Sequence, residues 1–220
     1  MGWWSEFKKW LSGANPPDHI GDADLPACRA ATWEDVLMVT GLLEQHAAKY
    51  VLVGGYALMV NGIVRQTGDV DIVVENSVEN NAKWIAAMAE LPDREAAVLI
   101  GEDDPFPRDD DPYGKDEGPC VLRIADVIVV DVMPRACGLT FAQLVPNIVR
   151  VEVGADQEIS VLDLYGLWLT KQAPRDKDRA DKTQIEYALT QLQAWPADHE
   201  ARLVSIQKAM ETNNTSGIED

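Results

Sequence analysis

The stretch from residue 51 to residue 74 constrains the fold of this chain more than any other. It begins with an apolar run, 51–53, that stops at the pair Gly54-Gly55, and it ends with a second apolar run, 70–74. Because glycines stop a helix from continuing, 51–53 is predicted to be a short buried strand. The residues after the glycine pair suit a helix of one or two turns. The expected order is therefore strand, glycine turn, short helix and strand.

Two carboxylates, Asp69 and Asp71, lie at the start of the second strand. A strand places residues i and i+2 on the same face, so both side chains point the same way. Carboxylates held together repel each other and take up a proton unless a cation lies between them, and their hard oxygen ligands favour Mg²⁺ or Mn²⁺. The alternative is structural: the aspartates cap the turn after Gly68 or pair with Arg65.

Three further features favour a metal site. Asp131 interrupts another apolar run, 127–133, and if that strand lies beside the first, three carboxylates converge and can ligate two ions. Gly54 and Gly55 offer bare backbone N–H groups to an anion, although a plain tight turn uses the same residues. Five basic residues fall within 171–182 of a chain with net charge -18, which indicates a polyanion site or, alternatively, exposed ion pairs on a helix.

These motifs together resemble the signature of the DNA polymerase β-like nucleotidyltransferase superfamily. A glycine pair is followed, after thirteen residues, by Asp-Val-Asp between apolar residues, with Asp131 in the place of the third carboxylate. More narrowly, the chain is similar to the minimal nucleotidyltransferases that include abortive-infection toxins. The residues that carry this narrower resemblance are Arg65, Thr67, Asp69 and Asp71, followed by Lys171, Arg175, Lys177, Asp178 and Asp181. It covers about 33–195. Tyr56 departs from it, because many relatives carry a small hydroxyl residue there.

The resemblance implies an enzyme that moves a nucleoside monophosphate from an NTP to an acceptor hydroxyl and releases pyrophosphate. It implies two Mg²⁺ or Mn²⁺ ions bound by Asp69, Asp71 and Asp131, with Asp131 also serving as base. The nucleotide-binding residues that it implies are Gly54, Gly55, Tyr56, Arg65, Thr67, Lys171, Arg175 and Lys177. Of these, Arg65 and Thr67 are expected to brace the aspartate turn rather than touch substrate. The acceptor stays open: a protein, an RNA end or a small molecule.

The whole pattern predicts an α+β fold, a mixed β-sheet with flanking helices and a C-terminal helical part; the resemblance identifies the sheet as a nucleotidyltransferase core. Four segments are expected: 1–31, a Trp-rich amphipathic helix and connector; 32–161, the core; 162–212, the helical part; and 213–220, a flexible tail. Further strands are predicted at 96–100, 121–124, 127–133, 148–153 and 159–161, the last two at sheet edges. Further helices are predicted at 32–49, 77–91, 141–144, 162–172, 179–195 and 197–211.

Two segments carry predictions of a different kind. Residues 3–11 hold three tryptophans at helical spacing, which suits an anchor for a partner protein, a helix packed on its own domain or, less readily, a membrane surface. A second hypothesis follows: a structural or interaction subunit, for example of a phage particle or a toxin–antitoxin pair, that docks through this helix. The acidic, proline-containing stretch 101–119 is expected to be a solvated loop, with closure over a substrate as the alternative.

The composition of the chain indicates which partners and which cellular compartment to expect. The chain has 19 basic and 37 acidic residues, so nonspecific binding to a polyphosphate backbone is disfavoured. Its three cysteines are scattered, which argues against a disulfide framework, and no apolar run approaches the length of a membrane span. A cytoplasmic protein is therefore expected, or a virion component if the chain is phage-encoded.

Overall fold

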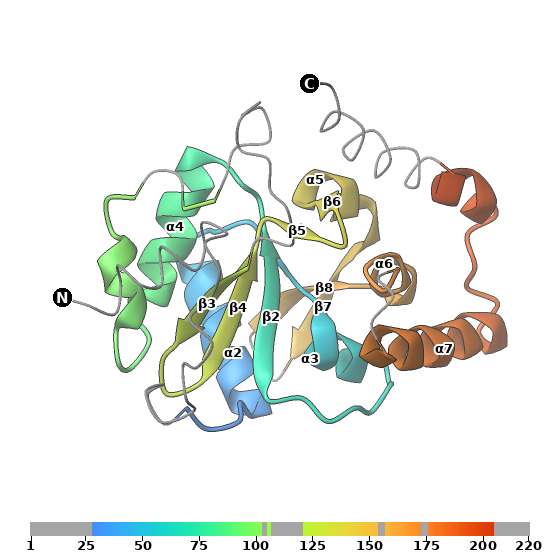
Figure 1. The fold of residues 1–220 in the computed structure, drawn as a ribbon, viewed down its shortest axis with the longest axis horizontal. Coiled ribbons are helices and arrows are strands. Elements are labelled where there is room, and N and C mark those ends of the chain that lie inside the picture. Colours follow the sequence, from blue (N-terminus) through green and yellow to red (C-terminus); the bar gives the residue numbers. More distant parts are fainter. Residues whose placement is uncertain (1–27, 103–104, 107–120, 154–156, 173–175, 205–220) are drawn as a thin grey trace, which may run out of the picture.

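The computed structural model describes residues 28–102, 105–106, 121–153, 157–172 and 176–204, and the structural statements below concern these residues (Figure 1). Several predictions lie outside them: the Trp-rich helix at 3–11, most of the acidic loop at 101–119, Arg175 and the tail at 213–220. The side chain of Lys177 is also outside the described part, although its backbone belongs to a helix.

A six-stranded sheet in the order β3-β4-β2-β1-β8-β7 forms the centre of the molecule (Figure 1). Its strands are β1 (Tyr50–Leu52), β2 (Asp69–Val74), β3 (Leu122–Ala125), β4 (Val129–Met133), β7 (Ile148–Val153) and β8 (Gln157–Leu162). β2 pairs in parallel with β4, and β1 in parallel with β8, whereas the other three pairings are antiparallel. A second, two-stranded sheet joins β5 (Arg135–Ala136) to β6 (Leu139–Thr140). The predicted mixed sheet is confirmed.

Helices flank this sheet, as predicted. They are α2 (Trp33–Gln45), α3 (Gly54–Val60), α4 (Val78–Met88), α5 (Phe141–Leu144), α6 (Leu164–Leu169) and α7 (Asp176–Gln191), with 3₁₀ turns η1 (Glu95–Leu99) and η2 (Val145–Asn147). α2 packs on α4, while α3 contacts α6, and α6 contacts α7. Residues 199–204 are helical as well. Helices therefore dominate the described chain after β8.

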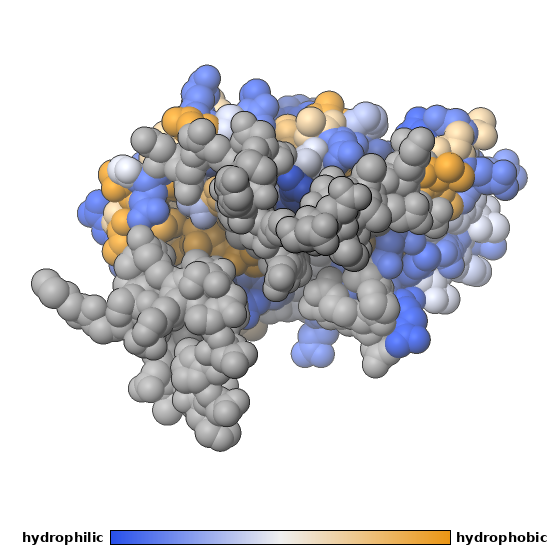
Figure 2. Space-filling model, turned by 45° about the horizontal axis from the view of Figure 1, so that its top comes forward, coloured by the Kyte–Doolittle hydropathy of each residue, from blue (hydrophilic) through white to orange (hydrophobic). Residues whose placement is uncertain are grey.

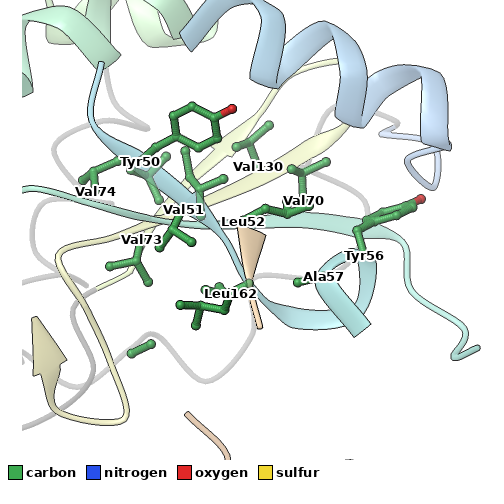
Figure 3. Close-up of a cluster of buried hydrophobic side chains, with 14 of the residues drawn as sticks. Tyr50, Val51, Leu52, Tyr56, Ala57, Val70, Val73, Val74, Val130 and Leu162 are labelled. Atoms are coloured by element: carbon green, nitrogen blue, oxygen red, sulfur yellow. The ribbon is translucent and has the colours of Figure 1, made fainter. Parts of the chain in front are cut away.

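The strand alternation divides the core between the two faces of the sheet (Figure 3). Val70 and Val130 point toward α2, and Val73 points to the opposite side. All three are fully buried. Because side chains alternate along a strand, Asp69 and Asp71 share the face of Val73 rather than the face covered by α2. The apolar residues between the aspartates thus anchor β2 while leaving the carboxylates on one side.

The segment 96–100 is a 3₁₀ turn rather than the predicted strand. Ala96 and Leu99 are buried, whereas Val98 and Ile100 are 59% and 63% exposed. That spacing of three positions matches a 3₁₀ turn and not the two-residue period of a strand. The backbone N–H groups of Asp93 and Glu95 donate to the buried carboxylate of Asp126, which holds the 3₁₀ turn against the connection between β3 and β4. The apolar composition alone could not distinguish the two conformations.

The predicted strands at 148–153 and 159–161 both form, but only the first lies at an edge of the sheet, whereas both were predicted to be edge strands. β7 is an edge strand, whereas β8 lies between β7 and β1 and is fully buried at Ile159 and Val161. Two predicted helices differ in length: α6 is shorter than 162–172, because Asp163 caps it through the Gly166 N–H, and α7 begins at 176. Apart from the segment 96–100 and the short strands β5 and β6, which were not predicted, the described elements follow the predicted order.

The surface view is mostly hydrophilic among the described residues, with hydrophobic residues concentrated on the side where α4 and η1 lie (Figure 2). This matches a chain with net charge -18. Within the described ranges, no helix combines the length and the apolar character needed to cross a membrane.

Candidate metal centre

Three aspartates converge where β2 and β4 run side by side. The parallel register pairs Asp71 directly with Asp131, and Asp69 precedes Asp71 by two residues on the same face. Each residue offers a carboxylate oxygen, and these oxygens all lie within 4.8 Å of one another. Asp131 is buried, while Asp69 and Asp71 are partly exposed. The sequence predicted three converging carboxylates only if the two strands were neighbours. In the fold β2 and β4 are neighbours, and the three carboxylates do converge.

Arg123 on β3 completes this cluster, and the sequence reasoning missed it. Its antiparallel register places it opposite Asp131, to which Nε and Nη2 donate at 2.8 and 2.7 Å. Nη2 is also 4.0 Å from Asp69 Oδ2. The hydrogen bond to Asp131 raises the pKa of Arg123, so the guanidinium stays charged. Only the pairing of β3 with β4 reveals this residue, and no local motif marks it.

The glycine pair lies directly against the aspartates. Gly54 has a φ of +66°, and a Cβ at this position would overlap the carboxylate of Asp71. A Cβ on Gly55 would lie 2.5 Å from Cβ of Thr67, closer than real Cβ contacts allow. Thr67 Oγ1 in turn donates to Asp69 Oδ1 at 3.1 Å. Both glycines thus make room for side chains that shape the cluster, and Thr67 contacts Asp69 as expected.

Arg65 reaches away from the aspartate turn. Its Nη1 pairs with Asp181 Oδ2 of α7 at 3.1 Å, and this same oxygen lies 3.1 Å from Lys171 Nζ. Lys171 is also 3.3 Å from Asp178 Oδ1 and is only 9% exposed at its side chain. Asp178 and Asp181 are both buried. The structure therefore joins Arg65 and Lys171 to Asp178 and Asp181 in a largely buried network.

Tyr56 uses its side chain for packing. The residue is 4% exposed, its ring centroid lies 6.3 Å from that of Trp33, and its hydroxyl donates to the backbone carbonyl of Ala31. Burial raises the pKa of Tyr56, so the phenol stays neutral. The segment before α2 is tied to the same region, because the Ala31 N–H donates to the Gly68 carbonyl. Tyr56 thus connects α3 to the segment beside the start of β2.

The donor set suits a hard divalent cation. Three carboxylates supply only oxygen ligands, which Mg²⁺ and Mn²⁺ prefer, and their mutual repulsion favours a cation among them. Asp69 is 37% exposed at its side chain, so the cluster is open to solvent. Gly54 adds a stretch of backbone without a side chain next to Asp71. The residues present therefore fit a metal site in number, chemistry and access.

Comparison with known proteins adds no assignment to this geometry. No protein-family model matches the chain, and a search of curated proteins found no match.

Proposed function

We propose that this protein is a metal-dependent nucleotidyltransferase that transfers a nucleoside monophosphate from an NTP to an acceptor hydroxyl and releases pyrophosphate. The observation that carries the proposal is the register between β2 and β4, which pairs Asp71 with Asp131. It brings three carboxylates together beside a glycine pair whose backbone is bare. The resemblance of these motifs to polymerase β-like nucleotidyltransferases supports the same reaction class.

In the proposed reaction the acceptor oxygen forms a bond to the α-phosphorus of the NTP. The bond from that phosphorus to the oxygen leading to the β-phosphate breaks, and pyrophosphate leaves. Asp131 is the proposed acceptor of the hydroxyl proton. Asp69, Asp71 and Asp131 would hold divalent ions, which supply Lewis-acid stabilisation of the phosphate charge and activation of the hydroxyl.

The remaining residues of the site position these groups. The Thr67 hydroxyl donates to Asp69 and fixes the direction of that carboxylate. The absence of side chains at Gly54 and Gly55 makes room for Asp71 and Thr67. The backbone N–H groups of the two glycines, at the start of α3, are the proposed contacts of a phosphate. Arg123 holds Asp131 at both carboxylate oxygens. Together these contacts preorganise the carboxylates before substrate arrives, which is how a site of this kind lowers a reaction barrier.

The test is label transfer from NTPs. The purified protein is incubated with Mg²⁺ or Mn²⁺, a cell lysate and each of the four NTPs, labelled either at the α- or at the γ-phosphate. We expect a stable labelled product with an α-labelled NTP and not with a γ-labelled one. Asp69→Asn should reduce the transfer at least about a hundredfold, because the variant loses a charged ligand of the proposed site.

Glu75→Gln serves as the matched control. Glu75 is an acidic residue that follows β2 directly and pairs with Lys49, so its loss tests charge removal at the other end of the strand. It should leave transfer unchanged. Absence of transfer with every NTP, or equal transfer by wild type and Asp69→Asn, would contradict the proposed reaction. The second hypothesis, an interaction subunit, predicts the absence of transfer with every NTP.

A further inference from the structure

Arg123 and a divalent ion need the same carboxylate. Both oxygens of Asp131 accept hydrogen bonds from the Arg123 guanidinium, at 2.8 and 2.7 Å. Nη2, one of the two donating nitrogens, also lies 4.0 Å from Asp69 Oδ2. Two-point contact of this type is the strongest common geometry between an arginine and a carboxylate. The guanidinium therefore occupies the side of Asp131 that faces Asp69.

The charges at the cluster make this contact consequential. Each of the three aspartates places one carboxylate oxygen within 4.8 Å of the others, and the Arg123 guanidinium pairs with Asp131 and Asp69. A divalent ion placed among the same oxygens would meet a like charge at close range, which disfavours its binding. Arg123 is 54% exposed at its side chain, whereas that of Asp131 is 9% exposed. The arginine can thus swing toward solvent, while the aspartate stays fixed in the sheet.

We propose that Arg123 is a built-in counter-cation that competes with the divalent ion for Asp131. With no ion bound, its charge offsets those of Asp131 and Asp69. When an ion binds, the guanidinium releases or shares at least one oxygen of Asp131, so metal affinity is set lower than the three aspartates alone would give. The inference rests on the proposed metal site and names Arg123 as a positioning residue that regulates it.

The experiment measures Mn²⁺ binding directly, without substrate, by calorimetry and by the electron paramagnetic resonance signal of free Mn²⁺. Replacing the cation, Arg123→Gln, should tighten Mn²⁺ binding about tenfold, the size expected for removal of a screened, half-exposed charge near a divalent ion. The same variant without metal should melt at a lower temperature than wild type. Arg123→Lys keeps the charge but loses the two-point contact with the carboxylate. Its Mn²⁺ affinity should lie between those of wild type and Arg123→Gln.

Arg150→Gln is the matched control, because Arg150 on β7 also pairs with a carboxylate, Glu44, at the other side of the sheet. It should leave Mn²⁺ affinity unchanged. Unchanged or weaker Mn²⁺ binding by folded Arg123→Gln would overturn the competition. A third outcome is that Asp71→Asn abolishes Mn²⁺ binding while Arg123→Gln leaves the Mn²⁺ affinity unchanged. It would overturn this inference and leave the proposed metal site in place. If neither wild type nor Arg123→Gln binds Mn²⁺, both proposals fail.

Discussion

At the scale of single residues, the glycine pair has a mechanical role beside its proposed contact with phosphate. The Asp71 carboxylate fills the space that a side chain at position 54 would need, and Thr67 fills the space beside position 55. The sequence alone suggested a turn or an anion site at these glycines. The structure adds that their missing side chains determine where two residues of the aspartate cluster can lie.

Gly54→Ala should therefore damage the cluster, and Gly62→Ala should not. Both glycines have positive φ, +66° and +83°, so both substitutions strain the backbone by about 1 kcal/mol. Only at position 54 does the new Cβ also displace Asp71, and that variant should lose about 2 to 4 kcal/mol of unfolding free energy in total. It should also bind Mn²⁺ at least about tenfold more weakly.

Urea unfolding and Mn²⁺ titration of both variants check this prediction. At Gly62 a Cβ would meet no heavy atom within 4 Å, so Gly62→Ala isolates the cost of backbone strain. Equal loss of stability in the two variants, or unchanged Mn²⁺ affinity in Gly54→Ala, would show that the contact with Asp71 has no effect on the cluster.

At the scale of elements, the start of α2 is linked to the strands that carry the aspartates. Asp35 accepts from the Thr32 N–H in a capping box and from both terminal nitrogens of Arg29, at 2.5 and 2.7 Å. The backbone N–H of Arg29 donates to the Val127 carbonyl just before β4. Folding of this helix end and alignment of the strands are therefore coupled.

Acid should weaken this end of α2. The Arg29 guanidinium lowers the pKa of Asp35 far below its ordinary value of 3.8. A carboxylate with a lowered folded pKa stabilises the protein above its unfolded pKa, and this stabilisation is lost as the pH falls toward the folded pKa. Asp35→Asn should cost about 1 to 2 kcal/mol at neutral pH, and this difference from wild type should shrink from about pH 4 downward.

Unfolding free energies of wild type and Asp35→Asn between about pH 7 and about pH 2.5 test the prediction. Asp198→Asn, at an exposed pair with Arg202, provides the comparison and should show a smaller effect. A difference between wild type and Asp35→Asn that is constant across this range would mean that ionisation of Asp35 does not contribute.

The elements themselves were largely predictable because local patterns encode them. Thr32 and Ser77 precede helices at the expected positions, and the alternating aspartates mark β2. Sequence reasoning failed where the conformation depends on partners distant in the chain. Burial of Ala96 and Leu99 made η1 a 3₁₀ turn, and pairing of β8 with β1 moved that strand to the interior.

At the scale of the whole molecule, a buried ionic network joins three parts of the chain. Lys171 follows α6, Asp178 and Asp181 lie on α7, and Arg65 belongs to the segment that leads into β2. The resemblance drew attention to these four residues but did not predict this arrangement, since it depends on how α6 packs on α7. The position of Arg123 was not predicted either, since long-range register brings it to Asp131.

Lys171→Met should destabilise the folded protein by about 3 to 5 kcal/mol, because it leaves buried carboxylates without a full complement of cations. Lys49→Met, at a pair with Glu75 whose lysine is 60% exposed, should cost less than about 1 kcal/mol. Chemical denaturation of both variants provides the measurement. A loss of unfolding free energy in Lys171→Met no larger than in Lys49→Met would contradict the importance of the network.

NTP-dependent label transfer by folded Lys171→Met separately tests the predicted contact of Lys171 with triphosphate.

The place of β2 in the sheet also has a consequence for synthesis of the chain. β1 and β2 are neighbours in sequence, but β4, which covers the other edge of β2, is made much later. Until then β2 is an apolar strand with one open edge, the kind of segment that pairs with other chains. Asp69 begins this strand and Asp71 interrupts its apolar run, and charges in such strands oppose aggregation. We therefore expect Asp69 and Asp71 to oppose such pairing while the chain is being made.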